Sequence, residues 1–250
     1  ISVAQANKIS IPASEHPDDI EAARQHMFSI REKHLFSNSW FSDPMILGHY
    51  PEEGISLFAA EMPQIEEGDL ECINQQLDYF GTNIYSGVHV KAGNDSGFEI
   101  VEKNDLPVTQ MGWPVTPEAL YWGPKFIHER YQLPIVVTEN GMANDDVVEN
   151  GKVYDKPRIE YLYQYLGEYS RAIKDGVPAQ GYFLWSMMDN FEWAEGYSKR
   201  FGIVHVDYQT QQRTLKYSGH WYKALIASHI SGVLKDPVAK IVDDKPVEAV

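Results

Sequence analysis

The segment LPIVVTENG occupies residues 133–141 and indicates how this chain folds. Its β-branched run favours an extended strand, and Asn140 with Gly141 favours a turn directly after it. The apolar residues follow one another without alternation, which is typical of a strand covered on both faces in a parallel sheet. A helix is predicted next, because Pro157 suits a helix start and Gly176 suits a helix end. Together they predict one strand–helix unit of an α/β fold.

The same order of strand and helix recurs along the chain. Further strands are predicted near residues 3–8, 79–85 and 179–186, the last also buried. Further helices are predicted near 17–34, 116–131 and 218–231, with short helices at 55–61 and 69–77 and a hairpin at 201–214. Residues 37–66 otherwise indicate a long loop, and a polar excursion follows the second strand. This alternation predicts a parallel sheet covered by helices, although it supplies four units where a (β/α)8 barrel of about 250 residues needs eight.

Two of the predicted helices carry specific expectations. Thr116 and Pro117 are predicted to cap the helix that runs to about Tyr131, and Pro124 is expected to kink it or end it early. The helix that begins at Pro157 is predicted to bury one face. Its members are Ile159, Leu162, Tyr163, Leu166 and Ile173.

The composition excludes several classes of function. The chain has 21 basic and 36 acidic side chains and a net charge of −15, which argues against general nucleic-acid binding. No apolar run approaches the roughly 18 residues of a membrane span, and the start lacks a signal-peptide pattern. The single cysteine, Cys72, cannot form an internal disulfide. We therefore expect a soluble protein without a membrane partner, cytoplasmic by inference, with secretion left open.

Metal and nucleotide chemistry are not indicated. The nine histidines are scattered without an HExxH motif or paired-ligand spacing, and no glycine-rich phosphate loop follows a strand. We therefore expect neither a metal nor a cofactor.

Polar residues at the ends of the predicted strands are the candidates for chemistry, because reactive groups gather at the carboxyl ends of parallel strands. Glu139 directly follows an apolar run, where an unpaired ion would be costly. A buried salt bridge or a helix cap would explain it as well as a functional role does. Alternation sends Asn83 and Tyr85 to the same side of their strand, where they could orient a carboxylate or a sugar hydroxyl.

The segment LWSMMDNFEWAEGYSKRF, residues 184–201, interleaves aromatic residues with carboxylates. Indole faces stack on the C–H faces of a pyranose while carboxylates accept its hydroxyl protons, so the pattern suits a carbohydrate ligand. Core packing would explain Trp185 and Trp193 equally well, but it does not explain the neighbouring Glu192.

The TENG motif at 138–141 together with segment 184–201 resembles the signature of glycoside hydrolase family 1, the β-glucosidase and β-galactosidase family. The resemblance extends from Ile1 to about Leu234 and includes Asn83-Ile-Tyr85 and Met111-Gly-Trp113-Pro. It implies a (β/α)8 TIM barrel, of which this chain resembles the carboxyl-terminal half with strands five to eight. Residues 1–235 would form that half, and 236–250 would form a flexible tail.

The resemblance implies roles for three residues at the strand ends. Glu139 matches the catalytic nucleophile, Tyr85 matches the residue that hydrogen-bonds this carboxylate, and Asn83 lies beside it near the sugar. A retaining glycosidase needs two carboxyl groups about 5–5.5 Å apart, one as nucleophile and one as proton donor. An ionised nucleophile also needs hydrogen-bond donors nearby, which agrees with a tyrosine at this place.

The resemblance also implies a sugar site. Glu192 matches the carboxylate that accepts from two hydroxyls of the non-reducing sugar, Trp193 contacts the same sugar, and Trp185 is its stacking floor. Trp113 matches the aromatic platform for the leaving group, and Phe201 borders the pocket. Members acting on 6-phosphorylated sugars carry Ser and Tyr in place of Glu192 and Phe201, so this pair implies an unphosphorylated sugar.

The family's acid/base glutamate stands in an Asn-Glu-Pro motif, which is absent from these 250 residues. General acid catalysis contributes about 10²–10⁴-fold, so the chain needs that group from elsewhere. We therefore expect a retaining β-glycosidase that acts on a β-glycoside or oligosaccharide, whose amino-terminal half lies in the same or a separate chain. Two alternatives stay open: a non-catalytic carbohydrate-binding fragment, and a myrosinase-like thioglucosidase in which Gln replaces the acid/base.

Overall fold

The computed structural model describes residues 1–34, 37–94 and 97–230. These residues form two compact units, and each is described here by itself. The first comprises Ile1–Pro107, Trp113–Asn140 and Tyr165–Phe183. The second comprises Val108–Gly112, Gly141–Gln164 and the described residues from Leu184 onward. The tail expected at 236–250 lies outside the described residues.

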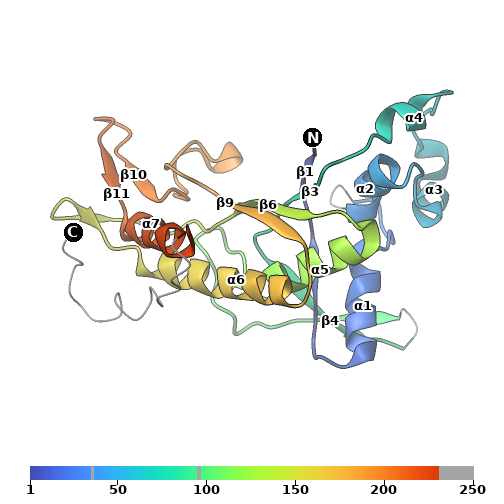
Figure 1. Cartoon of the computed structure of the whole chain (residues 1–250), viewed down its shortest axis with the longest axis horizontal. Coiled ribbons are helices and arrows are strands. Elements are labelled where there is room, and N and C mark those ends of the chain that lie inside the picture. Colours follow the sequence, from blue (N-terminus) through green and yellow to red (C-terminus); the bar gives the residue numbers. More distant parts are fainter. Residues whose placement is uncertain (35–36, 95–96, 231–250) are drawn as a thin grey trace. The chain divides into compact units, whose positions relative to one another are not determined.

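A four-stranded sheet contains all four predicted strands (Figure 1). Its order is β1 (Ala4–Ala6), β3 (Phe80–Asn83), β6 (Ile135–Asn140) and β9 (Ala179–Leu184). β1 with β3 and β3 with β6 pair in parallel, as alternation with helices predicts. Ile135 and Val137 on one face of β6 are fully buried and Val136 on the other face is 7% exposed, which confirms that this strand is covered on both faces.

The prediction that the 179–186 strand is buried is wrong. Phe183 of β9 is 61% exposed. β9 is the last strand in the order of this sheet, so it lacks the neighbour that covers β6.

The helices of the first half are shorter and more numerous than predicted. Here lie α1 (Pro17–Phe28), α2 (Asn38–Ile46), α3 (Glu52–Phe58), the 3₁₀ turn η1 (Ala59–Glu61) and α4 (Asp69–Ile73). α1 ends before residue 34 because Ser29 adopts an extended conformation, with φ −71° and ψ 147°. The segment 37–66 was predicted as a long loop, and α2 was not expected in it. Contacts with distant residues stabilise α2, because the Asn38 amide donates to the Lys8 and Met27 carbonyls at 2.8 Å each.

α5 (Ala119–Tyr131) begins three residues after the predicted cap and runs through Pro124 without ending. The Thr116 hydroxyl accepts from the Gly87 amide at 2.8 Å, so it joins a strand instead of capping the helix. The prediction that Thr116 caps this helix is therefore wrong.

α6 (Lys156–Lys174) exists as predicted, and two of the five residues assigned to its buried face, Ile159 and Leu162, are buried. Tyr163 and Ile173, assigned to the buried face, are 47% and 48% exposed. The buried stripe instead contains three tyrosines at intervals of four. Its members are Ile159, Tyr161, Leu162, Tyr165, Tyr169 and Ala172.

The remaining elements are small. β2 (Ile9–Pro12), β4 (Gly87–Ala92) and β5 (Phe98–Val101) form a three-stranded sheet that the sequence pattern did not indicate. The expected hairpin is present as antiparallel β10 (Val204–Val206) and β11 (Arg213–Leu215), and a second pair is β7 (Val148–Glu149) with β8 (Lys152–Val153). η2 (Trp193–Glu195) and α7 (Tyr217–Ile230) complete the fold.

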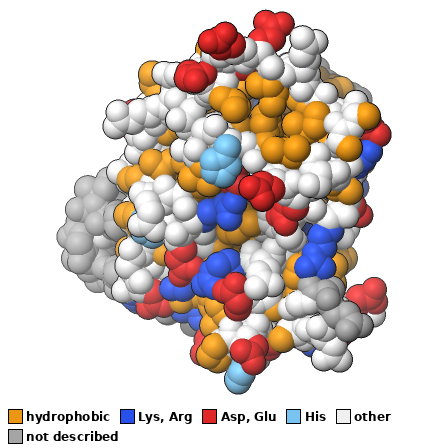
Figure 2. Space-filling model, turned by 90° about the vertical axis from the view of Figure 1, so that its right-hand side faces the viewer, with side chains coloured by type: hydrophobic (Ala, Val, Ile, Leu, Met, Phe, Trp, Pro, Cys, Tyr) orange, Lys and Arg blue, Asp and Glu red, His pale blue; other side chains and the backbone are white. Residues whose placement is uncertain are grey.

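The helices α2–α4 are labelled at the upper right of Figure 1. The segment that contains them has five exposed large apolar side chains, which are Phe41, Leu47, Ile55, Ile65 and Ile73. Figure 2 views that side and shows hydrophobic side chains gathered in its upper part among acidic ones. Apolar atoms make up roughly 55–60% of an ordinary protein surface, so these side chains by themselves assign no function. Within the described ranges, none of the helices has the length and apolarity needed to traverse a lipid bilayer.

Candidate active site

Four of the eight candidate residues lie in the first unit, at or beyond the carboxyl ends of β3 and β6. They are Asn83, Tyr85, Trp113 and Glu139. The other four lie in the second unit, in the segment that follows β9. They are Trp185, Glu192, Trp193 and Phe201.

Glu139 and Tyr85 are joined directly. The Tyr85 hydroxyl donates to Oε2 of Glu139 at 2.6 Å, a short bond typical of a hydroxyl on a carboxylate. Among the first-unit residues that the structure describes, none donates a second hydrogen bond, to the other carboxylate oxygen, Oε1. The Tyr85 ring also packs against Trp113, with centroids 5.1 Å apart. The structure therefore brings a carboxylate, its donor and an indole together at one end of the sheet.

Asn83 has a different partner on β6. Its Oδ1 accepts from the Thr138 hydroxyl at 2.6 Å, while Tyr85 contacts the next residue, Glu139. The register of β3 against β6 shifts between Thr82 and Asn83, so simple alternation does not describe the end of this strand.

Two supporting residues were missed by the sequence analysis. The buried Tyr165 hydroxyl of α6 donates to the Tyr85 carbonyl and accepts from the Thr116 amide, both at 2.9 Å. Asn140, fully buried, donates to the Ile84 carbonyl at 2.8 Å and accepts from Tyr182 at 2.8 Å. The backbone around Tyr85 is thus held from two sides. The tyrosine repeat at 161, 165 and 169 was the available signal.

The second unit places Glu192 beside Trp185. The Trp185 indole N–H donates to Glu192 Oε2 at 3.4 Å, and Glu192 is only 8% exposed. Phe201 is buried, whereas Trp193, at the start of η2, is 83% exposed. A buried carboxylate beside an indole is able to accept sugar hydroxyls.

The position of Gly141, directly after Asn140, has room only for glycine. A Cβ atom at this position would lie 1.8 Å from the Trp185 carbonyl oxygen. The backbone of the turn after β6 therefore packs so closely on residue 185 that no side chain fits.

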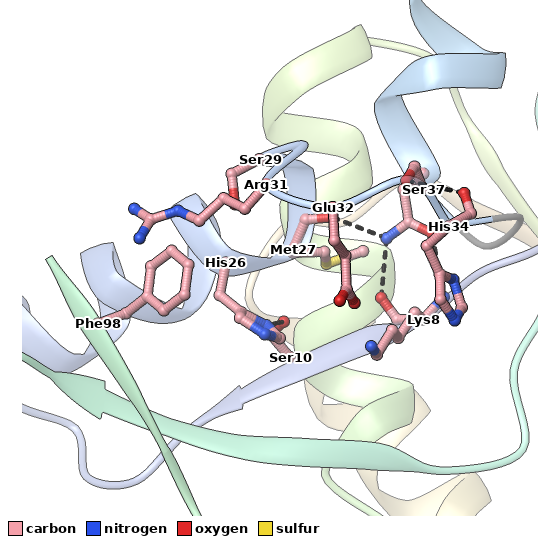
Figure 3. A pocket seen from close by; sticks show the side chains of 11 residues that line it. Lys8, Ser10, His26, Met27, Ser29, Arg31, Glu32, His34, Ser37 and Phe98 are labelled. Atoms are coloured by element: carbon pink, nitrogen blue, oxygen red, sulfur yellow. Dashed lines mark hydrogen bonds between the residues drawn. The ribbon is translucent and has the colours of Figure 1, made fainter. Parts of the chain in front are cut away.

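A separate cavity of about 260 Å³ lies in the first unit, between α1, β2 and the loop after α1 (Figure 3). Phe98 separates two of its lining groups: the Arg31 guanidinium lies 3.9 Å from the ring centroid, and the His26 ring meets it edge-on at 4.8 Å. Burial, with Lys8 and Arg31 nearby, lowers the pKa of His26. None of the candidate residues lines this cavity.

Among the residues with assigned positions, no three His, Cys, Asp or Glu side chains lie close enough together to hold a metal ion.

Comparisons with known proteins identify the family of this chain. The sequence profile described as glycosyl hydrolase family 1 matches residues 1–230. The 1,4-β-D-glucan glucohydrolase of Thermotoga neapolitana is 48% identical over 223 residues, which cover 87% of this chain and 48% of that protein. β-Glucosidase A of Thermotoga maritima is 45% identical over 223 residues, with the same shares covered.

Solved structures show the same relation. The family 1 β-glucosidase of Thermotoga maritima in complex with isofagomine lactam matches with a TM-score of 0.74 and 45% identity. The match covers 90% of this chain and 50% of that chain. The α/β, TIM-barrel fold class is confirmed, and the chain spans about half the length of the curated relatives it matches.

Proposed function

We propose, since this chain belongs to glycosyl hydrolase family 1, that it carries the nucleophile and part of the sugar site of a retaining β-glycosidase. One observation carries the proposal: the Tyr85 hydroxyl holds one oxygen of Glu139 at 2.6 Å, at the carboxyl end of two parallel strands. The other oxygen of the carboxylate keeps its lone pairs for attack on the substrate. A carboxylate that only served as a salt bridge would need a cationic partner, and the described part of the first unit gives Glu139 none.

The reaction proceeds by double displacement. Glu139 forms an ester bond with the anomeric carbon as the bond from that carbon to the leaving oxygen breaks. The leaving oxygen takes a proton from the acid/base glutamic acid. Water then attacks the anomeric carbon, gives its proton back to the acid/base, and frees the Glu139 carboxylate. Tyr85 fixes the carboxylate throughout, and Trp113 provides an apolar surface for the leaving group.

The substrate is a β-glycoside that ends in an unphosphorylated, non-reducing β-D-glucosyl residue. The relatives are named as β-glucosidases and a glucan glucohydrolase, which favours glucose over other sugars. Glu192 accepts hydroxyl protons of that sugar, while Trp185 and Trp193 pack on its C–H faces. A sugar phosphate beside the buried Glu192 carboxylate would place like charges together, at a cost of several kcal/mol.

Residues 1–235, of which the last five lie outside the described residues, belong to the carboxyl-terminal half of the barrel, and the strands β1, β3, β6 and β9 are its strands five to eight. The acid/base comes from an amino-terminal half in the same or a separate polypeptide. Two facts support this: the 250 residues contain no Asn-Glu-Pro motif, and they span about half of the relatives.

The test uses the complete enzyme, in which the chain is combined with its amino-terminal half. Glu139→Gln is expected to lower kcat for a nitrophenyl β-glucoside by about 10⁴–10⁶-fold, as loss of a nucleophile does. Glu160→Gln, which removes an exposed carboxylate from α6, is the matched control and is expected to keep full activity. A 2-deoxy-2-fluoro-β-glucoside should leave a covalent adduct on the peptide that contains Glu139.

Each arm has an outcome that contradicts the proposal. If Glu139→Gln keeps its activity, Glu139 is not the nucleophile. A complete enzyme that binds the fluoro sugar without forming an adduct is a carbohydrate-binding protein instead. Full turnover by the 250-residue chain alone rules out a second half as the source of the acid/base.

A further inference from the structure

A chain of six charged side chains runs through the interior of the second unit. It contains three cations and three carboxylates that alternate, so its formal charges cancel. In order, the members are Arg200, Asp189, Lys216, Asp146, Arg158 and Asp155. All except Arg200 have side chains that are at most 1% exposed.

Asp189 is the most constrained carboxylate in this network. Its Oδ1 accepts from the Lys216 ammonium at 2.7 Å and from the Gly202 amide at 3.0 Å. Its Oδ2 accepts from the Arg200 guanidinium at 2.6 Å and from the Val206 amide at 3.3 Å. These four donors occupy the four lone-pair sites of a carboxylate, so Asp189 has no capacity left for a ligand.

The network is not the least costly way to fill this space. Buried ion pairs roughly break even against well-packed apolar residues, so stability alone does not account for five buried charges. Burial and the Arg158 charge lower the pKa of Lys216, opposed by Asp146 and Asp189. Burial raises the pKa of Asp146, but Arg158 and Lys216 outweigh it and hold this pKa below its usual value. What the pairs supply is a defined geometry.

That geometry concerns the segment with the sugar ligands. Asp189 lies four residues after Trp185 and three before Glu192, and its donors lie beyond the loop, at residues 200–206 and 216. Between these anchors, Phe191, Trp193 and Tyr197 are all exposed, so burial does not impose the path of the loop. A Cβ at Gly202 would lie 2.1 Å from the Asp189 amide, which shows how tightly the two ends of the loop are joined.

We propose that Asp189, held by Lys216 and Arg200, is a positioning residue that fixes the Glu192 carboxylate against the sugar hydroxyls. The proposal rests on the function assigned above, because it names the group that orients a sugar ligand of that site. Asp189 itself touches no substrate, since its lone pairs are all occupied. Its contribution passes through the loop and through Glu192.

The test compares Asp189→Asn with Asp155→Asn in the complete enzyme. Asp155 belongs to the same network, is equally buried, and loses the same charge, but its partners are Arg158 and Ser218, far along the chain of pairs from Glu192. Both variants are expected to lower the melting temperature. Only Asp189→Asn is expected to lower kcat/KM for a nitrophenyl β-glucoside, by about 10–100-fold, the range for a lost hydrogen bond to a charged group.

Two readouts separate positioning from general destabilisation. A Glu192 carboxylate that excludes a 6-phosphate must face the 6-position of the sugar. The fall in kcat/KM caused by Asp189→Asn is therefore expected to be smaller for the 6-deoxy-β-glucoside, which lacks the 6-hydroxyl. In a Glu192→Gln background, Asp189→Asn should cost less than about 3-fold, because residues that act through one another are not additive. An equal loss on both substrates together with additive effects overturns the proposal.

Amide hydrogen exchange tests the positioning role without an activity measurement. Amides of residues 190–198 are expected to exchange faster in Asp189→Asn than in Asp155→Asn. Arg200→Met removes one of the four donors at the partly exposed end of the network and is the milder variant if Asp189→Asn fails to fold. If the complete enzyme has no β-glucosidase activity but exchange at residues 190–198 still differs between the two variants, only the proposed function is contradicted. If exchange is identical in the two variants, the positioning role is contradicted.

Discussion

The carboxylates of Glu139 and Asp189 show how the number of donors determines what a side chain can do. Glu139 accepts from Tyr85 through one oxygen, and its other oxygen keeps lone pairs that can attack carbon. Asp189 accepts four hydrogen bonds and has none to spare. The first arrangement suits a nucleophile that must be oriented without being saturated, and the second suits an anchor.

At this scale we predict the effect of Tyr85→Phe. The change removes the hydroxyl that contacts Glu139 and keeps the ring that packs on Trp113. We expect kcat/KM for a β-glucoside to fall about 10–100-fold in the complete enzyme, since a hydrogen bond to a charged group contributes about 1.5–3 kcal/mol. Steady-state kinetics measure this loss.

The control for that variant is Tyr79→Phe, at a tyrosine that is likewise half-buried and precedes β3. It should leave kcat/KM within about 2-fold, as surface substitutions usually do. Equal activities of the two variants would show that Tyr85 does not orient the nucleophile.

At the scale of elements, α6 shows how tyrosines link a helix to the strand ends. Tyr165 bonds the Tyr85 carbonyl and the Thr116 amide, and Tyr169 donates to the Gly181 carbonyl at 3.0 Å. Both rings are buried, and the Tyr165 hydroxyl reaches backbone groups of two residues outside the helices and strands, whereas the Tyr169 hydroxyl reaches a carbonyl within β9. Because a buried backbone group without a partner is costly, Tyr165 stabilises the irregular backbone on which the candidate site is built.

We predict that Tyr165→Phe lowers the free energy of unfolding by about 1–3 kcal/mol, because it removes the hydroxyl that bonds the buried Thr116 amide and the Tyr85 carbonyl. Tyr163→Phe is the matched control on the same helix, two residues away, with its ring 47% exposed. We expect that change to stay within about 0.5 kcal/mol. Urea unfolding of both variants measures the difference, and an equal effect would contradict the role given to Tyr165.

For the whole molecule, protonation of buried histidines links stability to pH. Burial lowers the pKa of His26, His89 and His205, aided by the positive charges of Lys8, Lys103 and Arg200 respectively. In the unfolded chain these rings regain a pKa of about 6.5. Just below that pH the unfolded state therefore binds more protons than the folded state.

We predict that the free energy of unfolding falls as the pH drops below about 6.5. It continues to fall until the pH reaches the lowered pKa values of the folded state. Urea midpoints between about pH 7.5 and 5.5 measure this dependence. His26→Gln should reduce the slope, whereas substitution of the exposed His49 should not. A stability that rises on acidification through this range would contradict the prediction.

The sequence by itself determined the order of the elements and the identity of the candidate residues. Apolar runs located β3, β6 and β9, the Thr116-Pro117 pair indicated a helix start near α5, helix periodicity located α6, and the TENG motif pointed to Glu139. All these signals are local to one element. The pairing of Tyr85 with Glu139 was expected from the family resemblance and is present at 2.6 Å.

Only the tertiary structure decided the contacts between segments far apart in the chain. It placed Tyr165, instead of Tyr163, in the buried face of α6, because the hydroxyl of Tyr165 meets the backbone of residues 85 and 116. It formed α2 from a serine-rich segment through hydrogen bonds of Asn38, and it joined Asp189 to Lys216 in a network that no spacing indicates. The reason is physical: hydrophobic periodicity reports which residues leave water within one element, whereas a buried polar group is stable only beside the particular partner that folding brings to it.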